Sequence, residues 1–142
     1  AGGAGSAIAY ALAAGGVRSL DIVDVDRDRA DALVKRLESQ FPNCVFATAS
    51  GKRAEVDMVV NASTVGMKPN QGMPGDIGPL SPNTLVADVV ISERPTALVG
   101  HAIRCGCKWA DGCDMHAGQV DALVEFFAST SHDSVTAAAA AA

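Results

Sequence analysis

Hydrophobic and polar residues follow one another along the chain in short blocks that predict helices alternating with strands. Residues 6–14 are apolar almost all round, as expected of a helix buried between a sheet and other elements. In residues 27–40 the apolar positions recur with the period of an amphipathic helix. Two further helices are expected at residues 96–104 and 115–128.

Short apolar runs with the length of buried parallel strands lie between these helices. They are found at residues 19–25, 44–48, 57–62, 84–91 and 108–110. Strands that alternate with helices predict an α/β fold built on a parallel sheet. A long loop rich in glycine and proline, residues 63–82, separates the third run from the fourth and is of a kind that often carries function.

A glycine-rich turn stands before the first predicted helix. Gly2 and Gly5 have the spacing of the last two glycines in the dinucleotide fingerprint G-x-G-x-x-G, whose first glycine would precede Ala1. In such a turn Gly2 lets the backbone approach a pyrophosphate, and Gly5 lets the helix close on the sheet. The helix N-terminus supplies free N–H groups for the anion. The alternative is a flexible start of the chain that binds no ligand.

Two acidic residues follow the next predicted strand, where dinucleotide-binding proteins hold a ribose. Asp24 lies 19 residues beyond Gly5, so its carboxylate can accept hydrogen bonds from both ribose hydroxyls. Because the same charge repels a 2′-phosphate, Asp24 and Asp26 favour NAD over NADP. The alternative is that both acids only cap the helix that follows. Turn, buried helix, strand and terminal acid in this order predict a doubly wound, Rossmann-like parallel sheet that binds a dinucleotide.

Three later segments make the pattern more specific. They are residues 61–67 (NASTVGM), 87–90 (ADVV) and 111–119 (DGCDMHAGQ). Together with the glycine turn, they resemble the C-terminal cofactor domain of the shikimate/quinate dehydrogenase family over about Ala1 to Phe127. The resemblance implies the cofactor half of a two-domain enzyme. We therefore expect residues 1–130 to be an NAD(P)-binding domain whose first strand and N-terminal substrate domain are missing from this sequence.

The resemblance also implies which residues contact the ligands. The cofactor contacts fall into two groups, with Gly2, Gly3 and Ala4 at the pyrophosphate and Asn61, Ala62, Ser63, Val89 and Gly112 on the nicotinamide side. Gln119 would hydrogen-bond a substrate hydroxyl, because its amide both donates and accepts. The alternative for Gln119 is a solvated helix residue.

The sequence departs from the family in two informative places. Members of the family that use NADP carry Asn-Arg-Thr after the second strand, whereas this chain has Asp24-Val25-Asp26, which again favours NAD. Ile91 stands where the family has a tyrosine, so the sequence defines the substrate preference less closely than the identity of the domain. The catalytic lysine and aspartate of the family lie in its N-terminal domain, and we expect no catalytic residue in this segment.

The resemblance implies reversible hydride transfer between nicotinamide and a ring secondary alcohol of shikimate or quinate. Two alternatives remain open. One is a dehydrogenase for another hydroxylated or amino-shikimate-like acid, and the other is a non-catalytic NAD-sensing module, since fold does not determine function.

Composition and charge exclude several other classes of protein. With 142 residues, 49% hydrophobic and 19% charged, the chain has the balance of one ordered domain. A net charge of −5 argues against nucleic acid as a partner, and the chain contains no apolar run of the roughly 20 residues that span a bilayer. We expect a cytoplasmic protein, with a homodimer as one option. Residues 131–142 form a tail whose final alanines, Ala137 to Ala142, are either a real helix or residues recorded without their true side chains.

The cysteines offer one competing site. Cys105, Cys107, Cys113 and His116 could be drawn as zinc ligands, since thiolates and imidazole suit that metal. Their spacing is not that of a C-x-x-C pair, however, and Cys105 and Cys107 flank a short predicted strand. Reduced structural thiols and no metal site are the favoured interpretation.

Overall fold

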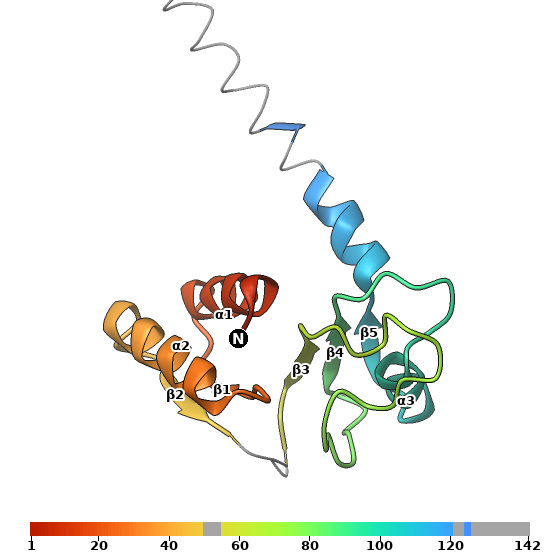
Figure 1. Cartoon of the computed structure of the whole chain (residues 1–142), viewed down its shortest axis with the longest axis horizontal. Helices are drawn as coiled ribbons and strands as arrows, with labels where there is room; N and C mark the ends of the chain where they lie inside the picture. The colour runs from red at the N-terminus through yellow and green to blue at the C-terminus, as the bar shows by residue number, and fades with distance from the viewer. Residues whose placement is uncertain (50–54, 121–123, 126–142) are drawn as a thin grey trace, which may run out of the picture.

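The computed structural model describes residues 1–49, 55–120 and 124–125, in which helices and strands alternate (Figure 1). The elements in chain order are α1 (Gly3–Ala14), β1 (Ser19–Ile22), α2 (Arg27–Gln40), β2 (Val45–Thr48), β3 (Met58–Asn61), β4 (Leu85–Asp88), α3 (Ala97–Arg104) and β5 (Lys108–Ala110). Residues 112–120 form a further helical segment. Within the described residues, no helix is long and apolar enough to cross a membrane.

Each predicted element has a counterpart, but several bounds were wrong. The first helix begins at Gly3, so Gly3 and Ala4 lie in its first turn. The run 19–25 is a strand only as far as Ile22, because β2, with which it pairs, ends at Thr48 in the same register. The run 84–91 stops at Asp88, where its pairing with β3 ends. The last helix begins at 112 rather than 115, and part of its predicted length lies outside the described residues.

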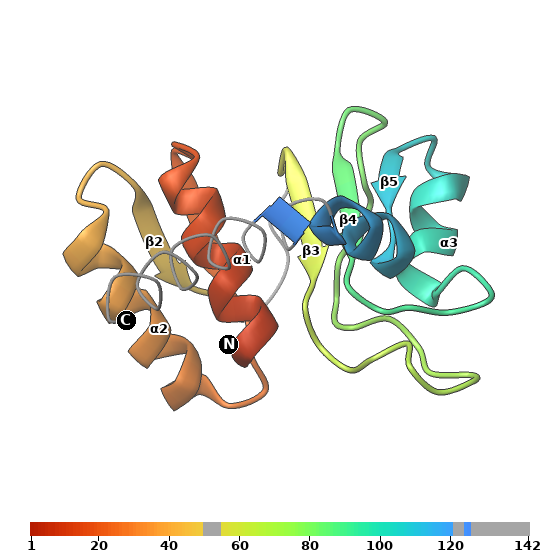
Figure 2. The same ribbon diagram turned by 90° about the horizontal axis from the view of Figure 1, so that it is seen from above.

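Within the described residues all the strand pairs are parallel, but they form two sheets where the pattern predicted one. β1 pairs with β2, and β3, β4 and β5 pair in that order. The two sheets stand side by side with β1 and β3 as neighbouring edges (Figure 1), and these two strands do not pair with each other. Figure 2 shows α1 and α2 beside the first sheet, and α3 beside the second. The α/β class with parallel strands is therefore confirmed.

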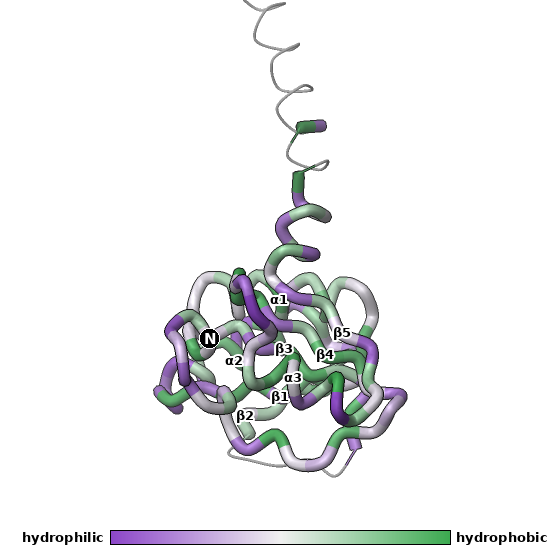
Figure 3. The backbone as a smooth tube through the Cα atoms, turned by 90° about the vertical axis from the view of Figure 1, so that its right-hand side faces the viewer, coloured by the Kyte–Doolittle hydropathy of each residue, from purple (hydrophilic) through white to green (hydrophobic). Residues whose placement is uncertain are grey.

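Two hydrophobic clusters hold the helices on these sheets. In the first, α1 and α2 bury Ala9, Ala13 and one face of α2 against Ile22 and Phe46. In the second, Leu98 and Ala102 of α3 pack with Val86 of β4 and with Cys107. Figure 3 shows apolar residues along β3 and β4. In α2, the apolar positions whose period predicts the helix are the ones that are buried in the first cluster.

Gly112 marks the closest approach of two backbone segments. A Cβ added at Gly112 would lie 2.5 Å from the carbonyl carbon of Val90 and 2.6 Å from both Ile91 N and Val89 O. The amide of Gly112 also donates to Val90 O at 3.3 Å. The start of the last helix is thus packed directly onto the turn after β4, with no room for a side chain.

We expect Gly112→Ala to lower the free energy of unfolding by about 1–3 kcal/mol or more, because backbone atoms must move to admit the methyl group. Gly118→Ala is the matched control, since a Cβ there meets nothing within 4 Å. In this control, alanine should stabilise the helix by about 0.5–1 kcal/mol. Denaturant unfolding of both variants measures the difference, and equal effects would contradict the close packing.

Cys107 belongs to the second cluster as a buried thiol. It is 7% exposed and donates to Ser81 O at 3.2 Å. Burial raises the pKa of the Cys107 thiol, and the neighbouring Cys105 raises it further. The fold therefore favours the neutral thiol. Its contribution to the free energy of unfolding is present below the ordinary thiol pKa of about 8.5 and is lost as the pH rises above that value.

At pH 8, iodoacetamide should alkylate the exposed Cys113 first and Cys107 last, because the reagent needs an accessible thiolate. Peptide mass spectrometry over a time course gives the order. Alkylation of Cys107 at the rate of Cys113 in the folded protein would contradict its assignment as a buried thiol.

Candidate functional site

The glycine turn forms an open helix N-terminus. Gly2 is the N-cap of α1 and provides no side-chain cap, so the first N–H groups of the helix have no side-chain acceptor there. A Cβ added at Gly2 or Gly3 would meet nothing within 4 Å. The turn therefore exposes backbone at the positive end of a 12-residue helix, an arrangement that suits a phosphate group.

Asp24 lies beside this turn, just beyond the end of β1. Its carboxylate accepts a hydrogen bond from the amino group of Ala1 and another, at 2.9 Å, from Asp26 N. The Asp24 carboxylate thus lies beside the glycine turn, and its contact with a ribose remains a prediction.

Asp26 has a different local role. Its side chain accepts from Arg29 N at 3.2 Å, as the N-cap of α2, and an oxygen of its carboxylate lies 3.8 Å from a guanidinium nitrogen of Arg29. The capping interpretation therefore holds for Asp26, whereas Asp24 is directed to the glycine turn. A contact between Asp26 and a cofactor remains a prediction.

The glycine turn also meets the segment that follows β3. A Cβ added at Gly5 would lie 3.5 Å from Cβ of Ala62, at ordinary contact distance. The first turn of α1 thus lies beside Ala62, although the two are far apart in the sequence. Three of the predicted segments, at Gly2–Gly5, Asp24 and Ala62, are brought together.

Asn61 and Ser63 form a hydrogen-bonded turn at the end of β3. Asn61 is 4% exposed, and its Oδ1 accepts from Ser63 N at 3.0 Å and from Ser63 Oγ at 2.7 Å. The Nδ2 of Asn61 donates to Val65 O at 3.0 Å and to the Asp88 carboxylate at 2.9 Å. The Asn61 amide is therefore occupied within the protein, while Ser63 is exposed and Ala62 half-buried.

The remaining predicted residues lie on the next strand end and on the last helix. Val89 follows β4 and is half-buried, and its amide donates to Asn61 O at 3.0 Å. Gly112 packs on the backbone of this same turn. Gln119 is exposed in the helical segment 112–120. Its contact with a substrate stays a prediction.

The sequence pattern assigned no role to two residues that organise this edge. Asp88 is 2% exposed and Thr96 is the N-cap of α3, and the Thr96 hydroxyl donates to Asp88 Oδ2 at 2.6 Å. The signal that could have found Asp88 is an acid inside the apolar run 84–91, since a buried charge needs hydrogen-bonding partners.

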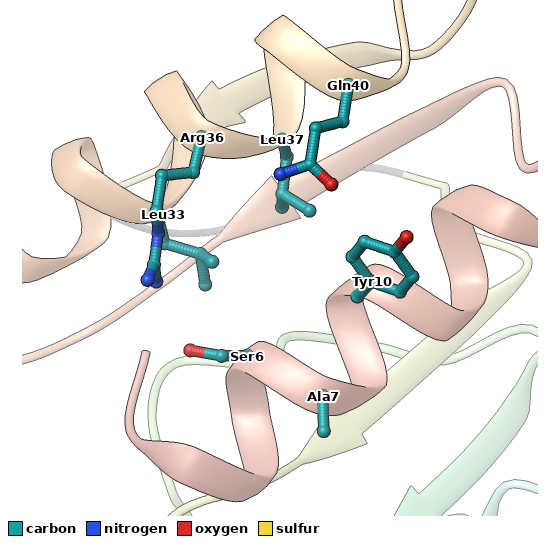
Figure 4. Close-up of a pocket in the computed structure, with 7 residues that line it drawn as sticks. All are labelled: Ser6, Ala7, Tyr10, Leu33, Arg36, Leu37 and Gln40. Atoms are coloured by element: carbon teal, nitrogen blue, oxygen red, sulfur yellow. The ribbon is translucent and has the colours of Figure 1, made fainter.

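Two hollows of the surface lie away from these residues. One, of about 270 Å³, lies between α1 and α2, where Tyr10 and Arg36 are among its lining side chains (Figure 4). None of the predicted contact residues lines it. Within the described ranges, no three potential metal-binding side chains gather. Cys105 lies instead 3.9 Å from Nε2 of His101.

Comparison of the sequence with known proteins gives two informative relatives. A shikimate dehydrogenase (NADP(+)) of Pseudarthrobacter chlorophenolicus is 37% identical over 138 residues, which cover 94% of this chain and 47% of the relative. A quinate/shikimate dehydrogenase (NAD(+)) of Corynebacterium efficiens is 36% identical over 129 residues, covering 87% of this chain and 45% of the relative. This chain spans about half the length of the curated relatives it matches. No protein-family model matches the sequence.

Comparison with solved structures gives two informative neighbours. A quinate dehydrogenase from Corynebacterium glutamicum in complex with NAD superposes with a TM-score of 0.69 at 35% identity, covering 82% of this chain and 43% of that one. A ligand-free 5-ketofructose reductase of Gluconobacter gives a TM-score of 0.72 at 29% identity, covering 83% and 44%. The predicted Rossmann-like fold is confirmed by these neighbours. The chain is a homologue of the shikimate and quinate dehydrogenases that corresponds to about half of their length.

Proposed function

We propose that this chain is the cofactor-binding part of an NAD-dependent shikimate/quinate dehydrogenase. When bound, the nicotinamide would exchange a hydride with the carbon of a ring secondary alcohol of the substrate. The role of this chain is to position the cofactor, and the acid/base group of the reaction would come from a substrate domain outside it. We place this activity in the cytoplasm, with shikimate or quinate as the substrate.

One observation carries the proposal: the glycine turn, Asp24 and the ends of β3 and β4 converge at one edge of the parallel strands. Ligands of doubly wound folds bind beyond the carboxyl ends of the strands. Ala1, which precedes the turn, has its nitrogen against the Asp24 carboxylate, and Gly5 lies beside Ala62. The adenosine ribose at Asp24, the pyrophosphate at Gly2 and the nicotinamide near Ser63 would then follow one another in the order that they have in a dinucleotide.

The residues present fit a dinucleotide. Gly2 and Gly3 leave space on the outer side of the turn, which a side chain would fill. Asp24 presents carboxylate oxygens to ribose hydroxyls, and no cationic side chain is bonded to its carboxylate among the described contacts. Because a 2′-phosphate would meet negative charge at Asp24, we propose a preference for NAD. Relatives named for each cofactor exist, so the preference rests on this residue.

The domain organisation is part of the proposal. β1 and β3 are neighbouring edges without pairing, and parallel sheets are ordinarily continuous and covered on both faces. We propose that a further parallel strand, preceding the glycine turn, lies between β1 and β3 and joins the two sheets into one. The substrate domain would precede that strand, and residues 1–130 would form the cofactor domain.

A second candidate is a reductase or dehydrogenase for a different hydroxylated substrate. The specific observation in its favour is the similarity to a 5-ketofructose reductase, together with Ile91 at the position of the tyrosine expected in the family. Ile91 is 63% exposed just beyond β4, so it lies on the side of the sheet from which a substrate would approach.

Nicotinamide reduction by the intact parent protein tests the activity directly. Shikimate and quinate are each offered with NAD and with NADP, and absorbance at the wavelength of the reduced nicotinamide is followed. We expect turnover with one of these acids and a higher kcat/KM for NAD. Turnover with only another polyhydroxylated substrate would favour the second candidate, whereas NADH binding without turnover of any alcohol would favour a sensing role.

Asp24→Asn tests the assignment of the ribose acceptor. Removing the charge should lower kcat/KM for NAD roughly 10- to 100-fold, the usual range for a lost charge-assisted hydrogen bond. It should raise the relative use of NADP, because the repulsion of a 2′-phosphate is removed. Asp28→Asn, in the first turn of α2, is the matched control and should leave the NAD/NADP ratio unchanged. Equal ratios in both variants would contradict the role of Asp24.

A further inference from the structure

Asp88 is a buried carboxylate at the end of β4 whose three hydrogen bonds reach three different segments. Its Oδ1 accepts from Asn61 Nδ2 at 2.9 Å and from Val90 N at 3.1 Å. Its Oδ2 accepts from the Thr96 hydroxyl at 2.6 Å. At 2% exposure, a carboxylate is costly to bury unless it is hydrogen-bonded, and here both oxygens have donors.

The donors can satisfy Asp88 in one arrangement. Thr96 Oγ1 accepts from Val99 N at 3.2 Å, which leaves its hydroxyl hydrogen for Asp88. Because an ionised carboxylate only accepts, the Asn61 amide must turn its NH₂ toward Asp88 and its oxygen toward Ser63. Asp88 thus determines which way the Asn61 amide faces.

The orientation of Asn61 in turn holds the loop after β3. The Asn61 Oδ1 receives both the amide and the hydroxyl of Ser63, and Nδ2 binds Val65 O. Ser63 Oγ also accepts from Val65 N at 3.1 Å. Reversal of the Asn61 amide would place NH₂ against the Ser63 amide, and the loop would lose its hydrogen bonds.

On its other side Asp88 holds the turn after β4. The bond from Val90 N fixes the turn around Val89, whose own amide donates to Asn61 O. Val90 is 1% exposed, and Gly112 packs on the backbone of residues 89–91. Both loops that carry the nicotinamide-side residues Ser63 and Val89 are therefore tied to a single carboxylate.

We propose that Asp88 is a positioning residue for the nicotinamide half of the cofactor site, acting through Asn61 and the turn at Val90. The inference rests on the proposed function and extends it, since no ligand contact is assigned to Asp88 itself. The glycine turn and Asp24 share no hydrogen bond with Asp88, so the adenosine and pyrophosphate part of the cofactor should be independent of it.

Asp88→Asn in the intact protein is the first test. Asparagine keeps one acceptor oxygen but turns an NH₂ toward either Thr96 or Asn61, so one donor loses its partner. We expect NADH to bind roughly 10-fold more weakly, which corresponds to a loss of about 1.4 kcal/mol of contacts with the nicotinamide. ADP-ribose, which lacks the nicotinamide, should bind within about twofold of the wild-type affinity. Asp57→Asn, an exposed acid at the opposite end of the β3–β4 pair, is the matched control and should change neither.

A second readout needs no cofactor. Amide hydrogen exchange of the free Asp88→Asn protein should accelerate at Ser63, Val65 and Val90, with exchange in α1 and α2 unchanged. Thr96→Ser, which keeps the hydroxyl, should exchange like the wild type, whereas Thr96→Val should reproduce part of the acceleration.

The outcomes separate the positioning role from a purely structural one and from failure of the proposed function. Parallel loss of NADH and ADP-ribose binding, or unchanged binding of both in a folded Asp88→Asn protein, would overturn the positioning role. A third outcome is that exchange accelerates locally in the Asp88→Asn variant while the wild-type protein binds neither NADH nor ADP-ribose. That result would support the hydrogen-bond network but overturn the proposed function, and with it the role at the nicotinamide.

Discussion

The arrangement of the site depends on one constraint, which is that the described strands all pair in parallel. Parallel strands in one sheet have their carboxyl ends at the same edge, so the residues after β3 and β4 meet without being close in sequence. The pairing of β1 with β2 places Asp24 at the corresponding edge of the other sheet. Helix α1 then joins the two edges, because its first turn meets both Asp24, through Ala1, and Ala62.

Burial of the Asp88 carboxylate imposes a stricter requirement for hydrogen-bond donors than exists elsewhere at this edge. Asp24 lies near the surface and uses donors that are close by, whereas Asp88 must obtain all its donors from the protein. A buried carboxylate can be satisfied only when β3, β4 and α3 are all in place, so its hydrogen bonds couple the loops of the site to the fold. Gly112 adds a steric requirement at the same turn.

The elements themselves were predictable because they depend on local periodicity. Helix α2 has the predicted bounds, since its apolar positions form one buried face and Asp26 caps it. Strand ends were predicted too long, because the apolar run after Leu85 continues to Ile91 while the pairing stops at Asp88. Hydrophobicity alone does not mark the residue at which a strand loses its partner. The division into two sheets depended likewise on pairing rather than on pattern.

The sequence by itself determined the order of helices and strands, the glycine turn and the acid that follows the next strand, because each depends on residues that are near neighbours in the chain. Only the tertiary structure decided the partners of Asn61 and Asp88, which are 27 residues apart, and the contact of Gly112 with the turn after β4. Hydrogen bonds and close packing between distant segments depend on how strands pair in space, and no local pattern encodes those distances.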